Sequence, residues 1–168
     1  HGEPMLQSLM DFETDVAILA HMEDDPELYY FPYSRSEVVL FVNTKHPWAD
    51  RKNVRIEELA GQKCILREKT SATRQALDQA IAKAGVTLGE TLEINSREAV
   101  MDGIIRSLGV GCVSKLEYVA HEHLRVIRLS DAEVFISFYV VCLNRRKNRP
   151  LIQAFLNTAK AIIKRGGA

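Results

Sequence analysis

Apolar residues recur along this chain in two patterns, one typical of buried strands and one of amphipathic helices. Short apolar or β-branched runs predict strands. These runs lie at 15–19, 28–34, 37–43, 63–67, 91–95, 110–114, 124–129 and 134–143. Apolar residues three and four apart predict helices, because that spacing gathers them on one helical face. The helical segments lie at 4–12, 56–61, 71–84, 96–108 and 150–164.

The order of these segments predicts an α/β fold. Strand and helix alternate across 63–114, which indicates right-handed βαβ units and a parallel sheet. The extended stretch 28–43 is too long for a single strand, and 124–143 gives two strands with no helix between them. Two long extended passages around a βαβ block indicate a chain that crosses to a second lobe and returns.

Several residues mark the predicted helix ends. Asn95 stands three residues before Glu98, which is the spacing of a capping box. Gly85 and Gly109 are expected to end the two helices of the βαβ block. Gly111 is expected to allow close approach of backbone to its strand.

Composition changes the picture mainly by what it excludes. The chain has 168 residues, 46% of them hydrophobic, and its 22 basic and 22 acidic residues cancel. Such a balance gives no support for binding nucleic acid or an anionic membrane by this chain alone. Residues 1–34 contain eight acids and no Lys or Arg, and seven bases lie between 145 and 165. We therefore expect the two ends to lie near each other, in preference to a basic tail for nucleic acid.

The cysteines and the absence of long apolar runs bear on location. Cys64, Cys112 and Cys142 each lie in an apolar stretch without a partner at metal-ligand spacing. An odd number of such thiols favours a reducing compartment. The sequence shows no stretch of about 18 apolar residues and no signal pattern at its start, so we expect a cytoplasmic protein.

The segment REKTSATR at 67–74 is the main candidate for a binding site. It places three hydroxyl groups among three cations, between a predicted strand and a predicted helix. The unpaired N–H groups of a helix start attract anions. Thr70 or Ser71 could equally well cap the helix without any ligand. On local evidence alone capping is favoured, and both interpretations stay open at this point.

Other candidates are weaker. His121 and His123 could form a metal pair, but a surface loop is favoured because no third ligand accompanies them. Cys112 lies within a strand without a cationic neighbour, so a buried structural thiol is favoured over a nucleophile. His21 follows a strand and is either a ligand contact or a loop residue. No catalytic residue pair, nucleotide motif, metal site or cofactor is predicted, so an enzyme is disfavoured.

Several passages in order resemble the effector-binding domain of LysR-type transcriptional regulators. They are DVAIL, SEVVLFVNTKHPWA, IEELAGQKCILREKTSATRQALDQAIAKAG and SLGVGCVSK. The resemblance covers essentially all 168 residues. It implies two Rossmann-like lobes of the periplasmic-binding-protein type II, joined by two crossover strands. Lobe I would combine 1–34 with 131–168, and lobe II would span 35–130.

The resemblance also implies a small effector, often an anion, bound between the lobes. Carried over by position, its contacts are Thr70, Ser71, Thr73, Ala20, His21, Arg35, Ser36 and Ser114. The family's DNA-binding winged helix-turn-helix and the first strand and helix of lobe I have no counterpart here. We therefore expect a truncated regulator that contacts DNA only through a missing domain. The full-length protein is expected to be a homodimer or tetramer, without a cofactor and without membrane contact.

Two alternatives remain on this scaffold. A solute-binding protein of a transport system shares the two-lobe plan but would carry a secretion signal. An enzyme on the same scaffold would show a titrating pair of residues, and the sequence offers none.

Overall fold

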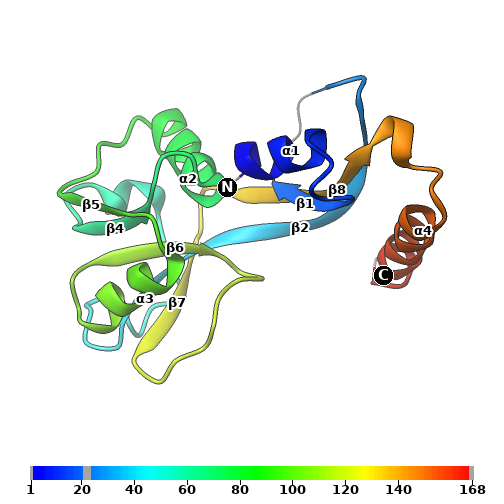
Figure 1. The fold of residues 1–168 in the computed structure, drawn as a ribbon. Coiled ribbons are helices and arrows are strands. Elements are labelled where there is room, and N and C mark those ends of the chain that lie inside the picture. The colour runs from blue at the N-terminus through cyan, green and yellow to red at the C-terminus, as the bar shows by residue number, and fades with distance from the viewer. Residues whose placement is uncertain (1, 21–23, 167–168) are drawn as a thin grey trace. The chain divides into compact units, whose positions relative to one another are not determined.

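The computed structural model describes residues 2–20 and 24–166, and Figure 1 shows its helices and strands. The α-helices are α1 (Gly2–Met10), α2 (Ala72–Lys83), α3 (Arg97–Ile105) and α4 (Pro150–Gly166). The strands are β1 (Ala17–Ala20), β2 (Leu28–Asn43), β3 (Asn53–Val54), β4 (Cys64–Arg67), β5 (Thr91–Ile94), β6 (Val110–Ser114), β7 (Leu124–Leu129) and β8 (Phe135–Leu143). Two short 3-10 helices, η1 (Ile56–Leu59) and η2 (Asn144–Arg146), complete the set in these residues.

The chain divides into two compact units. Unit 1 comprises His1–Arg35 and Ser137–Ala168, and unit 2 comprises Ser36–Ile136. The chain enters unit 2 along β2 and returns to unit 1 along β8. Both strands therefore contribute residues to both units.

Unit 2 contains the βαβ block. The strand order is β2-β6-β4-β5, with β4 parallel to both β5 and β6, which confirms the predicted parallel arrangement. Strand β2 runs antiparallel to β6 and β7, and the short β3, which the apolar pattern did not predict, pairs with β7. Helix α2 packs against β4 and β6, and α3 packs against β4, β5 and β6.

Unit 1 has a three-stranded sheet with a helix on each face. The strand order is β1-β8-β2, and β1 runs antiparallel to β8. Leu9 of α1 packs with Leu19 and Val141 on one face. On the other face, Ile152 and Leu156 of α4 pack with Val140 and Cys142 of β8. Because side chains alternate along a strand, successive residues of β8 supply the two cores.

The expectation that 28–43 exceeds a single strand is wrong. Residues Leu28–Asn43 form one strand of 16 residues, and each half of it belongs to a different unit. Pro32 removes one backbone donor, but its side chain lies exposed and the strand continues through it. Length limits derived from single sheets do not apply to a strand that serves two units.

Two predicted helix ends also need correction. The N-cap of α3 is Ser96, whose hydroxyl accepts a hydrogen bond from the Ala99 amide at 3.2 Å, and not Asn95. The helix ends at Ile105, and Ser107 takes the left-handed conformation (φ 62°) that was expected at Gly109. Gly109 has a different role, since a Cβ there would lie 2.4 Å from the Lys63 carbonyl oxygen.

The prediction for Gly85 is confirmed, and Gly111 does allow a close approach to its strand, although by a side chain and not by backbone. Gly85 follows α2 with a φ of 67°, a conformation that glycine adopts without strain. A Cβ at Gly111 would lie 2.6 Å from the Phe41 ring, so this glycine lets a buried aromatic side chain pack against β6.

Candidate functional site

The junction of β4 and α2 presents backbone and side-chain donors at one edge of unit 2. Ser71 has the extended conformation of an N-cap (φ −69°, ψ 129°), and its carbonyl accepts the first helical hydrogen bond from Gln75 at 2.9 Å. Its hydroxyl, however, makes no capping hydrogen bond. The capping role is therefore confirmed for the backbone and is wrong for the side chain.

The two threonines of the segment differ in exposure. Thr70 is exposed, whereas Thr73 is only 7% exposed. Within residues 2–20 and 24–166, the Thr73 hydroxyl has no hydrogen-bond partner. In the described residues, the fully buried side-chain polar atoms without a partner are Nε and Nη1 of Arg146, so solvent still reaches the Thr73 hydroxyl, and a polar group of a ligand could replace water there.

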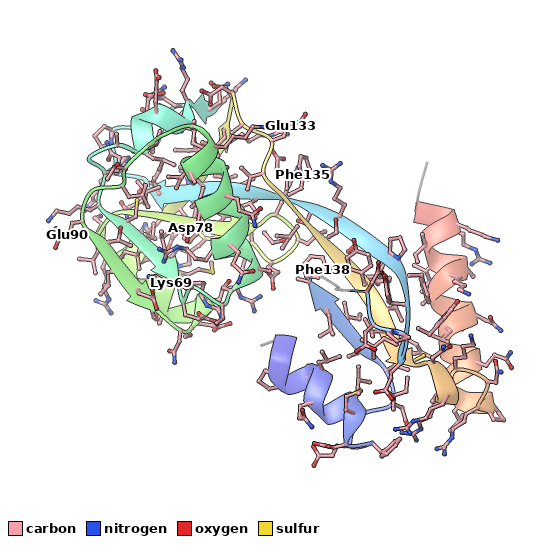
Figure 2. All side chains as sticks on the ribbon, turned by 90° about the horizontal axis from the view of Figure 1, so that it is seen from above. Lys69, Asp78, Glu90, Glu133, Phe135 and Phe138 are labelled. Carbon is pink, nitrogen blue, oxygen red and sulfur yellow. The ribbon has the colours of Figure 1, made fainter. Side chains whose placement is uncertain are left out.

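The three cations of this segment have separate environments. The Arg67 guanidinium makes two hydrogen bonds to the Glu68 carboxylate, at 2.8 and 2.9 Å, which hold the pKa of Glu68 below its usual value. Arg74 is nearly buried and bonds to Asp78 on the next turn of α2. Lys69 is exposed on the loop before α2, in the same region as the labelled Asp78 (Figure 2).

Ser36 and Ser114 are brought together by the pairing of β2 with β6. Their hydroxyl oxygens lie 2.7 Å apart, and the Leu116 amide donates to the Ser36 oxygen at 3.2 Å. Ser36 is 3% exposed and Ser114 is fully buried. These hydrogen bonds hold the middle of β2 to the end of β6 and the turn after it, so both hydroxyl groups are satisfied within the chain.

Ser114 ends β6 and the Thr70–Thr73 segment follows β4, which is the parallel neighbour of β6. The carboxyl ends of parallel strands meet at one sheet edge, the usual place for ligands in open α/β sheets. The structure thus gathers the predicted residues of unit 2 at one edge.

The remaining predicted residues belong to unit 1. Ala20 ends β1 opposite Phe138 and is partly buried. Arg35 is exposed near the middle of β2. His21 lies outside the described residues.

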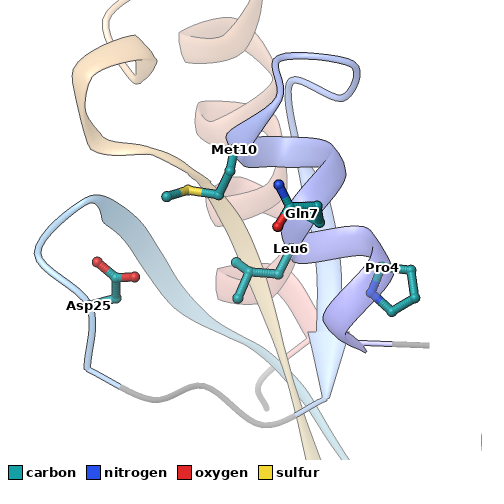
Figure 3. A pocket seen from close by; sticks show the side chains of 5 residues that line it. All are labelled: Pro4, Leu6, Gln7, Met10 and Asp25. Carbon is teal, nitrogen blue, oxygen red and sulfur yellow. The ribbon is translucent and has the colours of Figure 1, made fainter.

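Unit 1 also has a surface hollow whose described lining includes none of the predicted residues. It is lined by Pro4, Leu6, Gln7 and Met10 of α1 and by Asp25 (Figure 3). Among its described lining residues the one charged group is the Asp25 carboxylate, which would repel an anion.

The thiols and histidines have structural surroundings. Burial raises the pKa of Cys64 to about 11 and that of Cys112 to about 12, so neither is a thiolate at neutral pH. The His123 amide donates to Nδ1 of His121 within an exposed turn. Across the described ranges, no three His, Cys, Asp or Glu residues could together hold a metal ion.

Two carboxylates of the site were missed by sequence reasoning. Asp78 follows Arg74 by four residues, a spacing at which side chains on a helix meet, so this partner was available from sequence. Glu93 on β5 approaches Arg74 at 3.7 Å only because β5 lies beside β4.

Known proteins agree with this fold along nearly its whole length. The model of the LysR substrate binding domain matches residues 1–163. The regulator CysL of Bacillus subtilis is 25% identical over 132 residues, which cover 77% of this chain and 44% of CysL. The effector-binding domain of QuiR, solved with shikimate, matches with a TM-score of 0.87 at 20% identity, covering 97% of this chain and 78% of that one. The regulatory domain of Synechocystis CcmR, solved with 2-PG, gives a TM-score of 0.84 at 24% identity, with coverage of 98% and 80%.

The fold is therefore that of an effector-binding domain, an α/β fold of the periplasmic-binding-protein type II. The chain belongs to the LysR substrate-binding domain family. It spans about half the length of the curated relatives that it matches, and those relatives are transcriptional regulators. No helix among residues 2–20 and 24–166 is long and apolar enough to cross a membrane.

Proposed function

We propose that this domain senses a small anionic effector for a bacterial transcriptional regulator, and that the start of α2 binds the anion. One observation carries the proposal: within residues 2–20 and 24–166, the Ser71 and Thr73 hydroxyls make no intramolecular hydrogen bond, and both lie at the start of a 12-residue helix. There the free amide groups and the positive end of the helix dipole favour a negative charge. Thr70 is proposed to supply a third hydroxyl group at the exposed side of this anion site.

The effectors of two structural neighbours support the chemical class. QuiR was solved with shikimate, which is a carboxylate, and CcmR with 2-PG. The identity of this chain's own effector is a separate matter, because these neighbours are at most 24% identical to it.

Units 1 and 2 are proposed to be the two lobes, with Ala20 and His21 as contacts from lobe I and Arg35 as a contact from the first crossover strand. The proposed lobe boundaries are 1–34 with 131–168 and 35–130. In the structure, the unit boundaries lie after Arg35 and Ile136. Ser36 and Ser114 are proposed to stabilise the backbone beside the site without binding the effector directly, since their hydroxyl groups already bond to each other.

Regulation would follow from differential affinity. An effector shifts a conformational equilibrium only as far as it binds one state more tightly than the other. The domain is proposed to act without catalysis, in the cytoplasm, in a homodimer or tetramer. DNA contact is assigned to another part of the protein, which the balanced charge of this chain supports.

A thermal-shift screen of small carboxylates and phosphorylated acids, including shikimate and 2-PG, tests the proposal. A ligand present at 100 times its Kd stabilises the folded state by about 2.7 kcal/mol. The double variant Ser71→Ala/Thr73→Ala is expected to lose most of this stabilisation, because each hydrogen bond to a charged group contributes about 1.5–3 kcal/mol.

The control is Thr91→Ala, which removes an exposed hydroxyl from β5 in the same unit. It should respond to ligand as the parent protein does. A hit whose stabilisation survives the double substitution would overturn the placement of the site. Ser71→Ala alone tests little, because the backbone amide groups remain.

A further inference from the structure

The Arg74 side chain ties three elements of unit 2 together at the start of α2. Its Nε donates to both carboxylate oxygens of Asp78, at 2.8 Å each. Its Nη1 donates to the Arg67 carbonyl oxygen at 3.1 Å and lies 3.7 Å from Oε2 of Glu93. One guanidinium group thus connects the end of β4, the body of α2 and the neighbouring strand β5.

This arrangement is costly for a helix start. Arg74 lies in the first turn of α2, where a cation opposes the helix dipole. Its side chain is only 10% exposed, so the charge has also lost most of its hydration. Two carboxylates offset these costs, and the arrangement fixes the end of β4 against the helix that follows.

The contacts of Arg74 hold both ends of the loop that carries the hydroxyl groups. Between the Arg67 carbonyl and the first turn of α2 lie only Glu68 to Ser71, closed by a hydrogen bond from the Ser71 amide to the Glu68 carbonyl at 2.9 Å. The conformation of a loop this short depends on the positions of its two ends, which are Arg67 and the first turn of α2. The position of Arg74 therefore sets where Thr70 and Ser71 stand relative to the helix amide groups.

We propose that Arg74, held by Asp78, is the positioning residue of the anion site, acting through geometry and not through its charge. This inference rests on the proposed function of the α2 start. The Nε group of Arg74 already donates its hydrogen to Asp78. A lysine ammonium group cannot replace a guanidinium group that makes several directed hydrogen bonds.

Charge and geometry predict opposite outcomes for one substitution. Asp78→Asn removes a negative charge close to the site, so electrostatics alone would tighten anion binding. If Asp78 holds Arg74 in place, the same change loosens the loop and weakens binding. Arg74→Lys completes the test, because it keeps the charge and loses the fork.

The experiment is a titration of the 168-residue protein with inorganic sulfate at constant ionic strength, followed by NMR of the backbone amides of 70–74. The variants are Arg74→Lys and Asp78→Asn. The control is Asp102→Asn, which removes an exposed carboxylate from α3 and leaves Arg74 untouched. Spectra are taken well below each variant's unfolding temperature, so that affinity is measured on folded protein.

Both Arg74→Lys and Asp78→Asn are expected to weaken sulfate binding about tenfold, the size of one lost charged hydrogen bond. Hydrogen exchange of the Ser71 amide should accelerate in both variants, and Asp102→Asn should match the parent. A purely structural role would lower the unfolding temperature and leave affinity unchanged, which would overturn the inference.

Two further outcomes separate this inference from the function beneath it. Tighter binding in Asp78→Asn, or undiminished binding in Arg74→Lys, would show that charge acts directly and would overturn only the positioning role. Sulfate that shifts no amide of 70–74 in the parent protein would overturn the anion site itself, and the role of Arg74 with it.

Discussion

Hydroxyl groups of similar chemistry have two different environments in unit 2. Ser36 and Ser114 are buried and bond to each other, whereas Ser71 and Thr73 have no partner in the described parts of the chain. The difference comes from neighbours that strand pairing supplies, since Val38 of β2 lies opposite Ser114 of β6. Whether a hydroxyl group is satisfied within the chain is therefore decided by the residues that pairing places beside it.

The Ser36–Ser114 pair gives a stability prediction. Ser36→Ala leaves both the Ser114 hydroxyl and the Leu116 amide without their acceptor, so it should destabilise the fold by about 2–3 kcal/mol. Ser114→Ala removes a single donor and should cost about 1 kcal/mol. Urea unfolding of the two variants measures the difference, and a Ser114→Ala cost equal to or above that of Ser36→Ala would contradict the assignment.

At the scale of elements, the short helix η1 depends on one glutamate. Glu58 accepts a hydrogen bond from the Arg55 amide at 2.8 Å and two from the Arg51 guanidinium at 2.6 and 2.8 Å. These donors lower the pKa of Glu58 from 4.5 to about 2. The carboxylate therefore fixes the start of η1 and links it to the preceding loop.

Glu58→Gln should consequently lower stability by about 0.5–1 kcal/mol at neutral pH, the range of partly exposed ion pairs. Because the folded-state pKa is depressed, the stabilisation is present above about pH 4.5 and is lost as the pH falls toward 2. Thermal unfolding of parent and variant between pH 2 and 7 should show the gap closing on acidification. Glu57→Gln, which alters an exposed ion pair with Arg55, is the control and should show a smaller gap.

Helix α4 shows how an element can be predicted while its environment is not. Its apolar spacing predicted a helix, and Ile152, Leu156 and Ala159 are buried as expected for the face toward the sheet. Leu151 and Ile162 belong to the same apolar pattern but are 86% and 54% exposed. Periodicity identifies a helix, and only packing decides which apolar residues it buries.

At the scale of the whole molecule, each unit carries its own buried thiol. Cys142 lies in unit 1, and Cys64 and Cys112 lie in unit 2. Burial raises the pKa of all three above the ordinary value of 9.0. The chain therefore contains an internal reporter of unfolding for each unit.

Alkylation of the native protein at pH 8 should be slow at all three positions, and urea should expose them. Pulse labelling followed by peptide mass spectrometry will show whether Cys142 and Cys64 become reactive at the same urea concentration. Rapid labelling of Cys112 in the absence of denaturant would contradict its burial.

The raised pKa values of the same thiols limit the stability of the fold at alkaline pH. Each folded-state pKa is raised, so the thiols contribute no pH dependence below about pH 9, where both states are protonated. Above pH 9 the unfolded state loses protons first, and stability falls as the pH approaches 11 to 12. Replacing Cys112 with Ala should reduce this alkaline loss, measured by urea unfolding from pH 7 to 11.

The acidic and basic segments near the two ends of the chain belong to the same unit. The acidic first segment and the basic last segment meet in unit 1, where Arg146 pairs with Asp15 at 2.6 Å. The sequence anticipated that the two ends lie near each other. The pairing partner followed from the fold, because the η2 turn after β8 places Arg146 beside the loop that leads into β1.

The sequence by itself determined the α/β class, the parallel βαβ block and the helix start that presents hydroxyl groups. Those features depend on local periodicity, turn residues and the order of segments, all of which are written along the chain. Tertiary structure decided that Leu28–Asn43 is one strand serving two units, that Ser36 and Ser114 bond to each other, and that Glu93 joins Asp78 around Arg74. The length of this strand depends on its having pairing partners in both units. The Ser36–Ser114 and Arg74–Glu93 contacts join residues far apart in sequence, which only the pairing of strands brings together.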